Sequence, residues 1–281
     1  MKDRYLFRKA FDFTAVWGAA LLTAIAVVPL VSIIAFVAIR GFPALTASFF
    51  TQLPTPVGEP GGGMANAIAG SLILVAIASA VGIPLGVMSG VYLSEAGQSR
   101  LASAVRLSAD VLSGVPSIVI GIFAYTLLVR PIGHFSAWAG GVALGIIMIP
   151  TVTRTTEELL KLVPSSLREA ALALGVPRWR ATLRVVLRTA APGVATGVML
   201  AVARVAGETA PLLFTAFNNR FWADGLGEPT ASLPVQIYTY SVSPYEDWHQ
   251  QAWAAALVLV TVVLVLNAIS RFILRSKMEA R

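Results

Sequence analysis

Six stretches of this sequence are long, apolar and almost free of charge, and no other feature limits its possible folds so strongly. A bilayer core about 30 Å thick needs roughly 20 largely apolar residues per helix. The stretches that meet this requirement are residues 13–39, 65–93, 111–129, 131–153, 189–217 and 248–270. Only the fifth contains charged residues, Arg204 and Glu208. The sequence therefore predicts an all-α integral membrane protein with six transmembrane helices.

Composition excludes several other classes of protein. Of the 281 residues, 57% are hydrophobic and 12% are charged, and the mean hydropathy of +0.77 excludes a water-soluble globule. The absence of cysteine excludes a disulfide scaffold, a thiolate metal site and a thiol nucleophile. His134 and His249 have no second histidine nearby, so no metal site is expected. No pairing of a nucleophile with a base is visible either, so no catalytic residue is expected.

The distribution of Lys and Arg predicts the orientation of the chain. Residues 13–39 exceed the usual 7–15 residue core of a signal peptide, so this stretch is expected to be a retained first span. An N-terminus on the inside places 17 of the 21 Lys and Arg residues on the cytoplasmic side. Both termini are therefore expected in the cytoplasm. Membrane loops explain the net charge of +7 better than a nucleic-acid partner does.

Two outer loops differ in composition. The first loop is rich in Pro and ends in the run Gly61 to Gly63, which marks a junction between two parts of the chain. The expected parts are residues 1–64 (tail, first span and outer loop), 65–275 (a five-helix core) and 276–281 (a cytoplasmic tail). The last outer loop, 218–247, carries aromatic and acidic residues. Either an interfacial aromatic belt or a docking surface for an external partner would account for them.

The long inner loop, 154–188, contains the signals of a short helix, a tight turn and a second, basic helix. Ser166 and Glu169 have the spacing of a capping box, Gly175 suits a C-terminal cap, and Pro177 can open the next helix. The residues of the predicted apolar stripe are Leu167, Ala170, Ala171 and Leu174. A pair of amphipathic helices on an anionic lipid surface is the alternative interpretation.

Charge inside the fifth span predicts a site for an anion. Arg204 and Glu208 are four residues apart and can pair on one helical face. Each charge at the middle of a span costs on the order of 2.5–3.5 kcal/mol, so the two are expected to face the bundle interior. Arginine offers a planar fork of donors to oxyanions. We expect Glu208 to neutralise Arg204 in the empty pathway and to yield to an arriving oxyanion; a purely structural ion pair is the alternative.

Two further polar or flexible segments receive simpler interpretations. Gly114 and Pro116 should loosen the third span near its cytoplasmic end, either to line a watery cavity or as a simple kink. Glu157 and Glu158 lie beside cationic residues at the inner end of the fourth span, where a solvated charge cluster is expected.

The inner loop resembles the EAA loop of ABC importer permeases. Glu169, Ala170 and Ala171 are followed after three residues by Gly175, as in that pattern, although Arg188 stands in place of its final proline. The resemblance implies that the short helix docks into a cytoplasmic ATPase. The chain has no phosphate-binding loop of its own, so it is not expected to hydrolyse ATP.

Three further segments are similar to the PstA- and PstC-type permeases of phosphate importers. They are the R-x-x-G-E-T stretch at Arg204, the G-V-P-S segment at Gly114 and the S-L-P-V-Q-I-Y segment at Ser232. The resemblance implies a type I ABC importer permease fold in the bacterial inner membrane and transport of inorganic phosphate. It also implies four partners: a second, PstC-type permease, two ATPase copies carrying ATP and Mg, an external phosphate-binding protein and membrane lipid.

Alternative functions come from two classes. An ABC permease for sulfate or molybdate would share the EAA loop. A secondary transporter driven by an ion gradient could use Arg204 and Glu208 as a relay, but it would have no need of a docking helix.

Overall fold

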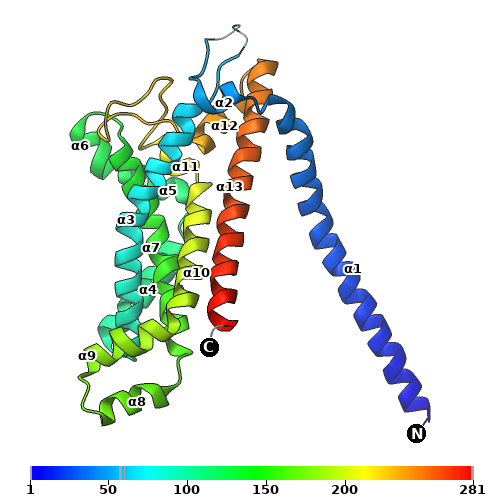
Figure 1. Cartoon of the computed structure of the whole chain (residues 1–281), viewed down its shortest axis with the longest axis vertical. Helices are drawn as coiled ribbons and strands as arrows, with labels where there is room; N and C mark the ends of the chain where they lie inside the picture. The colour runs from blue at the N-terminus through cyan, green and yellow to red at the C-terminus, as the bar shows by residue number, and fades with distance from the viewer. Residues whose placement is uncertain (1, 57–58, 60, 280–281) are drawn as a thin grey trace.

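The chain is helical almost throughout. The computed structural model describes residues 2–56, 59 and 61–279, and Figure 1 shows their helices as a bundle with one helix apart. The helices are α1 (Lys2–Gly41), α2 (Ala47–Thr51), α3 (Ala65–Glu95), α4 (Arg100–Gly114), α5 (Ser117–Ala124), α6 (Arg130–Ile132), α7 (Ala137–Lys161), α8 (Ser165–Ala173), α9 (Arg178–Ala181), α10 (Leu187–Ala206), α11 (Ala210–Leu213), α12 (Leu233–Ser241) and α13 (Glu246–Glu279). Single π-helical turns, Tyr125–Val129 and Thr182–Val186, continue α5 into α6 and α9 into α10.

Among the described residues, five helical segments are long and apolar enough to cross a membrane. They are Phe11–Ala44, Ala65–Glu95, Ala137–Lys161, Arg178–Ala206 and Glu246–Ile269. A sixth candidate is the pair Arg100–Gly114 and Ser117–Ile132, which is bent by 104°. The all-α membrane fold is confirmed, and the count of six holds if the bent pair is one span.

The third predicted span, 111–129, is wrong as a single helix. The chain leaves the helical conformation at Val115 and Pro116, where ψ is 131° and 135°. Proline has no N–H to continue the helix, and it disfavours helical geometry in the residue before it. The fourth span begins later than predicted, at Ala137, because Gly133 adopts a left-handed conformation and Ser136 caps the new helix.

The centre of the bundle is the close packing of α3 against α7. Gly82, Gly86 and Gly90 follow one another at four-residue intervals on α3, and α7 lies directly against them. A Cβ atom at Gly86 would lie 2.7 Å from the Cβ of Val152. Small residues at this spacing let two membrane helices approach closely and pack in van der Waals contact. Such packing is what holds helices together in lipid, because lipid tails are as apolar as the side chains and provide no hydrophobic driving force.

Helix α1 contacts the rest of the molecule mainly near its C-terminal end. The Phe36 ring meets the Trp253 ring of α13 edge-on, with 5.2 Å between their centroids. Below this contact the two helices diverge, as Figure 1 shows, and the apolar side chains from Phe11 to Ile33 are exposed. This arrangement agrees with an added first helix. The division of the chain between residues 64 and 65 stays a prediction. The short tail beginning at residue 276 also stays a prediction, and its last two residues lie outside the described part.

The segment 218–247 is folded onto the end of the bundle beside α2. Asn66 donates to the Asn219 carbonyl at 2.6 Å, and the Leu233 amide donates to Ser71 Oγ at 2.8 Å. The buried Gln236 side chain accepts from Asn218 Nδ2 at 2.9 Å. The marked ends of the chain and the loop that holds α8 and α9 all lie at the opposite end (Figure 1).

The α3–α7 contact gives a first testable expectation. Leucine at position 86 should force α3 away from α7 and destabilise the fold by about 1–3 kcal/mol, the usual effect of overpacking. Thermal unfolding of the Gly86→Leu protein in detergent measures this. Met88→Leu, on the exposed face of the same helix, is the control and should unfold like the unaltered protein. Equal unfolding temperatures for the two variants would contradict the close packing.

Candidate functional site

A cavity of about 210 Å³ lies where the α4–α5 break meets α7 and the end of α10. Its polar lining consists of Ser113, Ser117, Thr151, Arg204 and Glu208. The remaining lining residues are apolar: Leu112, Val115, Pro116, Ile120 and Ile147. Two segments that sequence analysis singled out separately, the one at Gly114 to Ser117 and the one at Arg204, therefore form one site.

The expected ion pair between Arg204 and Glu208 is not formed. Helix α10 ends at Ala206, and Gly207 closes it with an N–H bond to the Arg204 carbonyl at 3.2 Å. Glu208 thus lies beyond the helix, and the four-residue spacing no longer places the two side chains on one helical face. No ion pair joins either of them to another residue in the part of the chain that the structure describes. Both side chains instead line the cavity, where Arg204 is exposed and Glu208 is partly buried.

The start of α5 adds a second favourable feature for an anion. Ser117 is the first residue of α5, and it follows Pro116 on the cavity wall. The first N–H groups of a helix have no partner within the helix and carry a partial positive charge. The Arg204 guanidinium, which no described carboxylate pairs, and a helix N-terminus therefore line the same space, which suits a small oxyanion.

The predicted docking helix is present as α8, with one correction at its start. Pro164, not Ser166, is the N-cap residue, and no side chain caps this end. The capping-box prediction was wrong because proline can occupy the helix entrance, where its missing N–H breaks no intrahelical bond. The Gly175 prediction is confirmed, since its φ of +76° is left-handed and the Val176 N–H bonds to the Ala171 carbonyl at 3.1 Å.

The faces of α8 differ from the predicted apolar stripe. Ala171 is buried, but Leu174 is 85% exposed and Leu167 is 41% exposed. Glu169 and Ala170 are exposed as well. The helix therefore presents both apolar and acidic groups at the surface of this chain.

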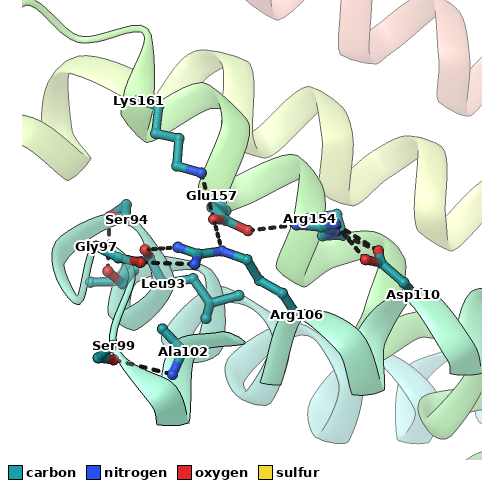
Figure 2. Close-up of polar contacts among 11 residues, drawn as sticks. Leu93, Ser94, Gly97, Ser99, Ala102, Arg106, Asp110, Arg154, Glu157 and Lys161 are labelled. Atoms are coloured by element: carbon teal, nitrogen blue, oxygen red, sulfur yellow. Dashed lines mark hydrogen bonds and ion pairs between the residues drawn. The ribbon is translucent and has the colours of Figure 1, made fainter. Parts of the chain in front are cut away.

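Glu157 is a functional candidate that sequence analysis misread. Its side chain is fully buried and is bonded by three cations, as Figure 2 shows. Arg106 Nε and Lys161 Nζ each lie 2.6 Å from Oε1, and Arg154 Nη1 lies 3.0 Å from Oε2. The expected solvated cluster is wrong for Glu157, although Glu158 is exposed as expected. We call Glu157 and its three cations the Glu157 cluster.

Part of the Glu157 cluster was visible in the sequence. Arg154 and Lys161 stand three residues before and four residues after Glu157, so all three share one face of α7. Arg106 comes from α4, and no local pattern predicts that contact. Without knowledge of the Arg106 contact, the sequence gives no reason to expect Glu157 to be buried, because groups of opposite charges on one helical face are common at protein surfaces.

Comparisons with known proteins place the chain in a family. A family model described as "Binding-protein-dependent transport system inner membrane component" matches residues 82–277. The "Phosphate transport system permease protein PstA" of Yersinia pestis is 48% identical over 239 residues, which cover 85% of this chain and 81% of the relative. The PstA 1 protein of Mycobacterium tuberculosis strain CDC 1551 is 39% identical over 260 residues, covering 89% and 84%.

Solved structures share the fold at low sequence identity. A chain of a bacterial alginate ABC transporter, solved with an alginate-bound periplasmic protein, superposes with a TM-score of 0.66 at 14% identity, covering 93% of this chain and 94% of that one. A chain of the MetNI methionine ABC transporter gives 0.59 at 19% identity, covering 76% and 93%. These matches confirm the predicted ABC importer permease fold.

The chain is thus a multi-pass inner-membrane permease component of a binding-protein-dependent transport system, a subunit that is not itself catalytic. Within that class it belongs to the PstA family of phosphate transport permeases.

The Glu157 cluster generates a paired prediction. Glu157→Gln should destabilise the protein by roughly 2–3 kcal/mol. This is somewhat less than the loss of one partner from a fully buried ion pair costs, because the cations left without a carboxylate reach solvent. Lys161→Ala should cost less than about 1 kcal/mol, since the Lys161 side chain is 52% exposed. Thermal unfolding of both variants in detergent tests this order. A Lys161 effect as large as the Glu157 effect would mean that the carboxylate is not the centre of the cluster.

Proposed function

We propose that this chain is one of two permease subunits of an ATP-driven importer of inorganic phosphate, and that phosphate passes through the Arg204 cavity. The names of the relatives and the family membership support the substrate. The observation that carries the site is the Arg204 guanidinium, which has no ion-pair partner among the described residues and lines a cavity that also holds a helix N-terminus. A permanent cation within a membrane-spanning segment is expensive unless an anion accompanies it at some stage of the cycle.

Glu208 favours phosphate over other oxyanions at this site. Inorganic phosphate keeps an O–H group at neutral pH, whereas sulfate has only acceptor oxygens. Arg204 can donate to the charged oxygens, and the Glu208 carboxylate on the same cavity can accept from the remaining O–H. Against sulfate, the same carboxylate is a like charge with no proton to share. This arrangement replaces our expectation that Glu208 serves to neutralise Arg204.

The partners follow from the class of protein. We infer a second permease of PstC type, two copies of a cytoplasmic ATPase that carry ATP and Mg, and an external phosphate-binding protein. The exposed Glu169, Ala170 and Leu174 support docking of α8 into the ATPase. The folded segment 218–247, at the other end of the molecule, supports a contact with the binding protein. ATP-driven closure of the ATPase pair would then move α8 and alternate the access of the cavity.

The orientation proposed for the chain is cytoplasmic for both termini. The loop with α8 and α9 lies at the same end as both chain termini (Figure 1). That loop carries the basic residues Arg168, Arg178, Arg180, Arg184 and Arg188. Positive charge in short membrane loops accumulates on the cytoplasmic side.

Uptake of labelled phosphate tests the cavity. Cells that lack their own high-affinity importer are supplied with this chain and its partner subunits, and uptake is measured with and without excess sulfate. Arg204→Ala should reduce uptake to background while the complex still assembles, because the anion loses its principal donor. Arg130→Ala removes a cation outside the cavity and should leave uptake unchanged. Normal uptake by the Arg204→Ala transporter would overturn the site, and competition by sulfate would move the substrate to another oxyanion.

Docking of α8 separates an ATP-driven importer from a gradient-driven carrier. Ala170→Glu places a second carboxylate beside Glu169 on the exposed face and should abolish both phosphate uptake and copurification of the ATPase. Ser166→Ala, whose hydroxyl caps nothing in the described structure, is the matched control. A gradient-driven carrier would take up phosphate normally with Ala170→Glu and would not respond to depletion of ATP.

A further inference from the structure

An ion pair ties the docking helix α8 to the end of α3. Arg168 Nη2 of α8 lies 2.7 Å from Oε1 of Glu95, the last residue of α3. Both side chains are about one third exposed. Within the described residues, α8 makes this one ion pair with the bundle. The pair joins segments that are far apart in the sequence.

Arg106 ties the same end of α3 to α4 and α7. Its Nη2 donates to the Leu93 carbonyl at 2.8 Å, and its Nη1 donates to the Gly97 carbonyl at 2.8 Å. Its Nε donates to Glu157 of α7 at 2.6 Å. One guanidinium in Figure 2 therefore fixes the α3–α4 turn against the buried carboxylate of α7.

A second contact holds α4 to α7 one turn further along. Asp110 of α4 accepts two bonds from Arg154 of α7, at 2.8 and 2.7 Å. Paired bonds between a guanidinium and a carboxylate fix orientation as well as distance. Arg106, Asp110 and Ser113 follow one another at helical spacing on one face of α4, and Ser113 lines the cavity.

Helix α4 begins at Arg100, five residues after Glu95 and its ion pair with the docking helix, and it ends at the cavity wall. Its end continues into Pro116 and Ser117, which line the cavity together with Arg204. The bonds of Arg106 and Asp110 lie in the middle of α4, and Ser113 lies near its end at the cavity. All three residues belong to a single helix of 15 residues, which can transmit a tilt along its length.

We propose that the Arg168–Glu95 ion pair couples movement of the docking helix to α4, and that Arg106 and Glu157 position α4 so that this movement shifts the Ser113–Ser117 wall of the cavity. These four are positioning residues, since none of them lines the cavity. The proposal rests on the proposed function, because it needs α8 to move with the ATPase.

Charge reversal at the surface pair tests the tie. A partly exposed ion pair contributes only about 0–1 kcal/mol, so Glu95→Arg and Arg168→Glu should fold and assemble. In the purified complex in proteoliposomes, each single reversal should lower phosphate uptake per ATP hydrolysed by roughly fivefold, the factor that corresponds to about 1 kcal/mol. The double variant, Glu95→Arg with Arg168→Glu, restores the attraction and should restore that ratio.

The control is Glu158→Arg, the same charge change on an exposed residue of α7 that makes no ion pair among the described residues. It should leave uptake per ATP unchanged. Single reversals that behave like this control, or a double variant that stays as low as the single variants, would overturn the proposal. A merely structural role would lower complex yield in the single variants without changing uptake per ATP in the complex that remains.

A second readout does not depend on the transported ion. The chain has no cysteine, so Ser113→Cys introduces its one thiol into the cavity wall. In complexes whose partner subunits also lack cysteine, maleimide labelling of this thiol should change when ATP and vanadate are added, and the single reversals should abolish that change. A labelling response that persists in the single-reversal variants would overturn the proposed coupling through the Arg168–Glu95 ion pair. Failure of phosphate uptake in the unaltered complex would instead refute the proposed substrate, and the labelling result would still decide the coupling.

Discussion

Inside a bilayer the backbone has no water to bond, and this constraint determines where the chain can leave the helical conformation. Two of the breaks within the apolar segments are at Val115–Pro116 and at Gly207–Thr209. Both breaks adjoin the same cavity. Non-helical backbone is tolerated at membrane depth where protein or trapped water can satisfy it, and a cavity lined by polar side chains supplies such surroundings. The fold therefore places two of its irregular segments at the candidate site.

The charges of the bundle divide into two kinds. At Glu157, one fully buried carboxylate is bonded by three cations, and the side chains of those cations reach solvent. At Arg204 the cation faces a cavity and has no carboxylate partner among the described residues. Fixed pairs hold helices in register, whereas an unsatisfied donor is available to a ligand. Helix α4 contributes to both places, through Arg106 to the Glu157 cluster and through Ser113 to the cavity wall.

Hydropathy and spacing predicted most of the fold, because long apolar runs and turn residues are local signals. The membrane class, most of the spans, the helix α8 and its Gly175 cap were all available from the sequence. Three features were not. The burial of Glu157 depends on Arg106 from another helix, and the Arg204–Glu208 spacing suggested a pair because nothing local showed that α10 ends between the two residues. The meeting of the Gly114 and Arg204 segments in one cavity is a tertiary contact, although each segment was recognised separately.

The contact between Phe36 and Trp253 joins the first long helix to the last. During synthesis at about 5–20 residues per second, α1 leaves the ribosome roughly 10–40 s before its partner on α13 exists. Throughout that interval its apolar surface has only lipid, or an already finished neighbouring subunit, to cover it. The N-terminal helix must therefore be stable in the bilayer by itself, and its unbroken hydrophobic length is what the order of biogenesis requires.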